Sequence, residues 1–155
     1  MQKIASFTVD HTVLEPGIYV SRVDGDCVTY DLRMRKPNAG SYLSDLAMHS
    51  FEHMLATYMR SGSAAGRVIY VGPMGCRTGF YLIMRGSADD NAANLAALKE
   101  ALRGIISHRG KMPGAAKKEC GNYRCLSVEA AKKEAEAYLA VLDAVKTTTF
   151  RYETK

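Results

Sequence analysis

The feature that most restricts the fold is a pair of alternating runs near the N-terminus, separated by one tight turn. Residues 18–23 alternate between apolar and polar side chains, the chain turns at Asp-Gly-Asp 24–26, and the extended pattern resumes over 27–34. Two such runs divided by an Asp-Gly turn form a β-hairpin. An antiparallel sheet is therefore expected here, and the Pro- and Gly-containing segment 36–40 ends it.

Longer segments with the 3.6-residue period of helices follow, together with further short extended runs. Helices are expected at 41–60, 90–108 and 127–145, and strands at 67–71, 79–84 and 147–152. Ser41 is a suitable N-cap for the first helix. With no internal repeat and no linker, residues 1–155 predict a single α+β domain, in which an antiparallel sheet packs against about three helices.

Charge and hydropathy exclude several classes of protein. The net charge is +5, but the basic residues are scattered, and the pair Lys132-Lys133 stands beside Glu134 and Glu136, as on a solvated helix. Nucleic-acid binding is therefore not expected. No apolar run is long enough to cross a bilayer, and the first residues lack the pattern of a signal peptide. We expect a soluble, cytoplasmic protein with no membrane partner.

Two histidines within the first helix form a candidate metal site. His49 and His53 are four residues apart and share one helix face, so both imidazoles can reach one ion. Glu52 lies next to His53 and can move protons near that ion. The alternative is two exposed histidines beside an acid. The apolar residues of this helix favour burial, and buried polar side chains need partners.

A catalytic ion usually takes a third protein ligand. The candidates are His11, His108 and the cysteines. Cys120 is followed by Gly121, which allows the backbone to approach an ion closely. Cys125 is a weaker candidate, since a small buried side chain explains it. His108 ends a helix, where it is solvated or compensates the helix dipole.

A second cysteine stands in a loop rich in glycine. Cys76 lies between Gly75 and Arg77, and an adjacent cation favours the thiolate form of a cysteine. The alternative is a buried structural cysteine. Disulfides are not expected for any cysteine of a cytoplasmic chain.

Four blocks of sequence together carry a family resemblance. Residues 6–12, 49–53, 73–81 and 120–123 resemble the signature blocks of S-ribosylhomocysteine lyase, the LuxS family. They stand in the family's order and approximate spacing, so the resemblance covers essentially the whole chain. Four blocks are far more specific than the HxxEH pattern of residues 49–53 alone.

The resemblance implies a full set of roles. One divalent ion per chain is expected, natively Fe²⁺, with Zn²⁺ or Co²⁺ able to replace it. A homodimer is also implied, with active sites between its subunits. The implied metal ligands are His49, His53 and Cys120, the acid/base residues Cys76 and Glu52, and the substrate-binding residues Ser6, His11 and Arg33.

The implied reaction cleaves the thioether of S-ribosylhomocysteine. The products are homocysteine and 4,5-dihydroxy-2,3-pentanedione, the precursor of the quorum-sensing signal autoinducer-2, and the reaction also serves the methyl cycle. The sugar carbonyl migrates from C1 to C3, which makes the C4 proton acidic, and β-elimination then expels homocysteine thiolate. Each proton transfer needs an acid/base group, and a divalent ion stabilises the developing oxyanion.

The chain departs from the family pattern at two positions. Many members have an aspartate six residues before the loop cysteine, where this chain has Tyr70. Many have a lysine four residues before the substrate arginine, where this chain has Thr29. Both departures concern substrate contacts and leave the metal and acid/base positions intact.

Two rival functions remain open from the sequence. An HxxEH metallopeptidase would use Glu52 to activate water and would normally take a carboxylate as third ligand, so Cys120 and Cys76 favour the lyase. A basic binding module would instead show salt-sensitive nucleic-acid binding that survives metal removal.

Overall fold

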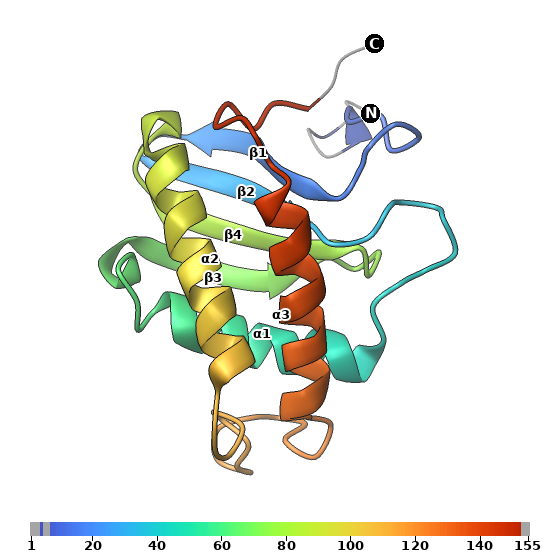
Figure 1. Ribbon diagram of the computed structural model, residues 1–155, viewed down its shortest axis with the longest axis vertical. Coiled ribbons are helices and arrows are strands. Elements are labelled where there is room, and N and C mark those ends of the chain that lie inside the picture. The colour runs from blue at the N-terminus through green and yellow to red at the C-terminus, as the bar shows by residue number, and fades with distance from the viewer. Residues whose placement is uncertain (1–3, 5–6, 153–155) are drawn as a thin grey trace.

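The computed structural model describes residues 4 and 7–152, which form one sheet with helices on one side (Figure 1). The sheet has the order β1-β2-β4-β3, and every neighbouring pair is antiparallel. Its strands are β1 (Gly17–Asp24), β2 (Cys27–Arg33), β3 (Val68–Pro73) and β4 (Gly79–Arg85). The helices are α1 (Asp45–Met59), α2 (Asn91–Ser107) and α3 (Val128–Asp143), with short 3₁₀ turns at Ala65–Arg67 and Ala88–Asp90.

The hairpin expected from the sequence is confirmed. Asp24 pairs with Cys27, and the turn between them uses Gly25 at φ +59°, a conformation that favours glycine. The α+β class with an antiparallel sheet and three helices is also confirmed for the described residues. None of the helices described here is long and apolar enough to span a bilayer.

The core lies between one face of the sheet and the helices. Alternate residues of the two central strands are at most 1% exposed, namely Val28, Tyr30, Leu32, Phe80, Leu82 and Met84. Burying each large apolar side chain contributes about 1.5–3 kcal/mol. In Figure 1, α2 and α3 cross the sheet side by side, and α1 contacts both of them and β3. Among the described residues, none of the three α-helices lies over the opposite face of the sheet.

Two expectations about local structure are wrong. The first helix is capped by Ser44, whose side chain accepts from Ala47 N, and not by Ser41. The reason is that Leu43 is buried and donates its N–H to Arg77 O, which holds the preceding segment in an extended conformation.

The segment 147–152 is not a strand. It lies beside β1 through a hydrogen bond from Val20 N to Phe150 O, at 2.7 Å. Phe150 has φ +49°, which an extended strand does not allow, so a regular ladder cannot continue past it.

Candidate active site

Helix α1 places two imidazoles next to each other. Its apolar side, which includes Phe51 and Met54, packs into the core, so a half-buried stripe faces the loop that joins α2 to α3. His49 and His53 lie on this stripe, and their ring centroids are 4.8 Å apart, in an edge-to-face arrangement.

Each imidazole is oriented by a main-chain carbonyl. His49 Nδ1 lies 2.8 Å from Cys125 O, and His53 Nδ1 lies 2.8 Å from Pro113 O. A carbonyl oxygen can only accept, so each Nδ1 carries the proton and each Nε2 is left with its lone pair. This is the usual support for histidines that bind a metal through Nε2.

Cys120 completes the cluster from the α2–α3 loop. Its Sγ lies 3.3 Å from His49 Nε2, and Asn122 N donates to that sulfur at 3.4 Å. The ligand atoms of His49, His53 and Cys120 all lie within 4.8 Å of one another. Two neutral nitrogens and one sulfur suit zinc, ferrous iron or cobalt in a site that keeps a position open.

A glycine allows the loop to approach His53 this closely. Gly114 has φ +70°, and a Cβ built on it would lie 2.9 Å from His53 Nδ1. Any side chain here would therefore be strained and would push against the imidazole. Nothing in the local sequence marks Gly114 as a neighbour of His53, 61 residues away, so its role could not be predicted.

The other ligand candidates have different partners. His108 lies 2.9 Å from Tyr58 OH and 3.1 Å from Lys111 O, and His11 Nδ1 lies 2.9 Å from Val9 O. Cys125 contributes its carbonyl, and its sulfur is not part of the cluster within the described chain. Of the candidates for the third ligand, Cys120 is the one that lies with both histidines among the described residues.

Glu52 stands next to His53 on α1 and is half-buried. Its carboxylate makes no hydrogen bond or ion pair with any residue that the structure describes. It is therefore available to exchange protons with a bound molecule.

Cys76 lies exposed in the turn between β3 and β4. Its Sγ is 3.0 Å from Thr78 Oγ1 and 3.9 Å from Arg33 Nη1. The cation beside the thiol is therefore Arg33 of β2, and the expectation that Arg77 plays this part is wrong. Arg77 has φ +59°, and its side chain instead reaches Asp45 on α1 at 3.4 Å.

Arg33 is held by a buried ion pair. Its Nε and Nη2 donate to the two carboxylate oxygens of Asp31, at 3.1 and 2.6 Å, and its Nη1 donates to Thr78 Oγ1 at 2.6 Å. Burial lowers the pKa of the Arg33 guanidinium, but the hydrogen bond and charge of Asp31 outweigh it, and the pKa is raised. The guanidinium thus stays charged beside Cys76.

Asp31 and its role were missed in the sequence analysis. The signal available was polar residues on the outward side of an alternating strand, Thr29, Asp31 and Arg33. An outward residue is normally exposed, but Asp31 and Arg33 are only 1% and 3% exposed. The structure explains this through Tyr152, which covers Asp31 and donates to its Oδ2 at 2.8 Å.

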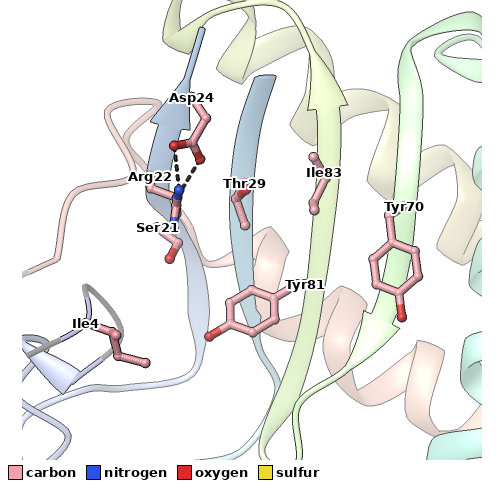
Figure 2. Close-up of a pocket in the computed structure, with 8 residues that line it drawn as sticks. All are labelled: Ile4, Ser21, Arg22, Asp24, Thr29, Tyr70, Tyr81 and Ile83. Carbon is pink, nitrogen blue, oxygen red and sulfur yellow. Dashed lines mark hydrogen bonds and ion pairs between the residues drawn. The ribbon is translucent and has the colours of Figure 1, made fainter. Parts of the chain in front are cut away.

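An open groove of about 540 Å³ lies on the sheet face away from the helices (Figure 2). Thr29, Ile83 and Tyr70 form one row across three strands of this groove. Both departures from the family pattern therefore line the same surface. The full lining comprises Ile4, Ser21, Arg22, Asp24, Thr29, Tyr70, Tyr81 and Ile83.

Tyr81 connects this groove to the thiol. Burial raises the pKa of the Tyr81 hydroxyl, as do the charges of Asp31 and Cys76, whereas Arg33 lowers it. Tyr81 pairs with Asp31 across β4 and β2, so this end of the groove adjoins the Asp31–Arg33 ion pair, whose guanidinium reaches Cys76. Of the residues expected to bind substrate, Arg33 lies at this end, His11 is half-buried in the N-terminal segment, and Ser6 lies outside the described residues.

The Cys76 loop is also joined to the start of α1. Leu43 N donates to Arg77 O at 2.9 Å, and Arg77 pairs with Asp45, the first residue of that helix. The helix that carries both histidines and the loop that carries the thiol are therefore held together.

Comparison with known proteins gives a consistent result. The sequence model of the family S-ribosylhomocysteinase (LuxS) matches residues 4–149. The chain is 42% identical to the S-ribosylhomocysteine lyase of Clostridium acetobutylicum, over 98% of this chain and 99% of the relative. It is 43% identical to that of Desulfotalea psychrophila and 42% identical to that of Borreliella burgdorferi (strain ZS7), with the same coverage.

Proposed function

The chain belongs to the S-ribosylhomocysteinase (LuxS) family of carbon–sulfur lyases, and we propose that it uses a divalent ion to cleave S-ribosylhomocysteine. The products would be homocysteine and 4,5-dihydroxy-2,3-pentanedione, the autoinducer-2 precursor. The observation that carries the proposal is the cluster of His49, His53 and Cys120, whose ligand atoms lie within 4.8 Å of one another.

The donor set supports one ion per chain. Both Nε2 atoms carry free lone pairs, and a thiolate from Cys120 would complete three protein ligands. Ferrous iron is proposed as the native ion, with zinc or cobalt as replacements. When bound, the ion would act as a Lewis acid that stabilises negative charge on substrate oxygens.

Cys76 and Glu52 are proposed as the two proton carriers. Moving the carbonyl from C1 to C3 removes a proton from one carbon and returns a proton to its neighbour, twice. The Cys76 thiolate, beside the Arg33 guanidinium, is suited to taking protons from carbon. The carboxylate of Glu52, which has no partner among the described residues, is suited to moving protons on oxygen. Loss of the C4 proton then expels homocysteine thiolate, which breaks the C5–S bond.

The substrate is proposed to bind beside the Cys76 loop, with Ser6, His11 and Arg33 as contacts, and the groove of the uncovered sheet face adjoins this position. A homodimer with active sites between its subunits is proposed on the same face. Large apolar side chains remain exposed on this face and in the N-terminal segment, including Ile4, Phe7 and Tyr70. Sedimentation at micromolar concentration should give a dimer, and a fully active monomer would contradict this part of the proposal.

A thiol-release assay tests the activity itself. Protein purified without oxygen should release free homocysteine from S-ribosylhomocysteine, and elemental analysis of the same sample should give about one divalent ion per chain. A chelator should abolish the release, and returning the ion should restore it. Peptide cleavage in place of thiol release would favour the metallopeptidase instead.

The ligand assignment has a matched pair of variants. Cobalt-loaded protein should show a thiolate-to-metal absorption band. Cys120→Ser should lose this band, while Cys125→Ser should keep it, because Cys125 offers its carbonyl to His49 and not its sulfur to the ion. The reverse result would overturn the assignment.

A further inference from the structure

The segment 147–152 is anchored to the rest of the fold by hydrogen bonds and by packing of an aromatic side chain. Asn91 Nδ2 donates to Thr148 O at 2.8 Å, and Phe150 is 2% exposed and packs edge-to-face against Tyr30. These contacts bring the segment to the outward face of β1, where the Tyr152 ring stacks on Tyr19 with centroids 4.9 Å apart.

The Tyr152 hydroxyl joins the network beside Cys76. It donates to Asp31 Oδ2 at 2.8 Å, and the same oxygen accepts from Arg33 Nη2 at 2.6 Å. Arg33 Nη1 then reaches Thr78 Oγ1, and lies 3.9 Å from Cys76 Sγ. Tyr152 therefore acts on the thiol only through Asp31 and Arg33.

The carboxylate of Asp31 determines where the guanidinium can lie. Asp31 is 1% exposed, so water does not compete for its oxygens, and its bonds to Arg33 and Tyr152 define its orientation. Burial and the charge of Asp31 both raise the pKa of the Tyr152 hydroxyl, so it remains a donor throughout the neutral pH range. A fixed donor on a buried carboxylate limits the rotation of that carboxylate and of the arginine paired with it.

We propose that Tyr152 is a positioning residue of the active site. Its hydroxyl fixes the Asp31 carboxylate so that Arg33 holds its guanidinium against the Cys76 sulfur. This inference rests on the proposed role of Cys76 as a proton carrier. It assigns a function to a C-terminal residue that lies outside the four signature blocks and makes no contact with the metal ligands among the described residues.

Tyr152→Phe tests the proposal, because it removes one hydroxyl and keeps the ring stacked on Tyr19. The matched control is Tyr138→Phe, which also removes one phenol hydroxyl with a 2.8 Å bond, here to the main-chain carbonyl of Gly17. Both variants should lose some thermal stability. Two further readouts separate them: turnover of S-ribosylhomocysteine, and the rate at which iodoacetamide alkylates Cys76 near neutral pH, followed by peptide mapping.

The expected result is specific to Tyr152→Phe. Its kcat should fall by about tenfold, less than the 10²–10⁴-fold typical for removing an acid/base group itself. Its Cys76 should be alkylated about threefold more slowly, because a less ordered guanidinium lies beside the sulfur for less of the time. Tyr138→Phe should keep the wild-type values of both.

Two results would overturn the proposal. In one, Tyr152→Phe keeps wild-type kcat and alkylation while it loses stability, which makes Tyr152 purely structural. In the other, Tyr138→Phe reduces both readouts equally, which makes the effect a general loosening. If the wild-type protein releases no thiol at all, the proposed function fails, and the alkylation rates still decide whether Tyr152 positions Arg33.

Discussion

The two parts of the candidate active site are held by different kinds of partner. In the metal cluster, carbonyls of the main chain orient His49 and His53. Around Cys76, the partners are side chains, Thr78 and Arg33, supported in turn by Asp31. Truncating a side chain cannot remove a carbonyl, so the metal cluster should respond to loss of a ligand or to a new atom that displaces an imidazole, and little to other side-chain changes. Around Cys76, by contrast, each substitution of a supporting side chain should lower turnover by a further step.

The largest expected effect comes from removing a metal ligand. His53→Ala takes away one Nε2 from a cluster with three ligands, so bound metal and turnover should both be lost. The protein should still fold, since His53 is only half-buried and the core side of α1 is unchanged. Elemental analysis and thiol release on one preparation check this. A variant that is fully active without metal would show that His49, His53 and Cys120 do not form a catalytic metal site.

The second largest effect should come from removing the Cys76 thiol while the metal cluster is left intact. Cys76→Ala should keep fold and metal but lose turnover by about 10²–10⁴-fold, the typical value of one acid/base group. Melting temperature, metal content and thiol release should be measured together. A well-folded variant with near-normal turnover would show that Cys76 has only a structural role, and the metal assignment would be unaffected.

The third prediction tests the backbone support of the metal cluster. Gly114→Ala would place a Cβ 2.9 Å from His53 Nδ1, which displaces the imidazole from Pro113 O. Metal affinity should fall by about 10–100-fold, as when the outer partner of a metal-bound histidine is lost.

Gly110→Ala is the control for this variant. Gly110 also has a positive φ, +110°, but nothing lies within 4 Å of the position of its Cβ. It should lose stability from the strained backbone and keep its metal affinity. An equal loss of affinity in both variants would mean that loop strain, and not contact with His53, is responsible.

The smallest effect should come from Thr78→Val. This change keeps the shape and removes the hydroxyl between Arg33 Nη1 and Cys76 Sγ. Leaving one donor of a buried cation unpaired costs about 1–3 kcal/mol of stability, and turnover should fall only several-fold, to roughly a fifth of wild type. Metal content should not change. Thr78→Ser keeps the hydroxyl and should restore turnover, and its failure to do so would exclude the hydrogen bond as the cause.

Part of this site could be read from local sequence, and part could not. The hairpin turn at Gly25 and the shared face of His49 and His53 depend on residues within one turn of chain. The true N-cap, Ser44, was missed because Ser41 is equally suitable by type, and the burial of Leu43 decides between them. The segment 147–152 has the composition of a strand, but the positive φ of Phe150 excludes it.

The sequence by itself therefore determined which residues of this protein are spaced to share a helix face or a turn. The cation beside Cys76 was decided only by the tertiary structure: Arg77 is adjacent in sequence, yet Arg33, 43 residues away, contacts the sulfur. The contact of Cys120 with His49 spans 71 residues, and that of Tyr152 with Asp31 spans 121. The physical reason is that backbone geometry repeats over a few residues and sets local neighbours. Contacts across such separations depend on how the sheet, helices and loops pack, and no local period encodes that packing.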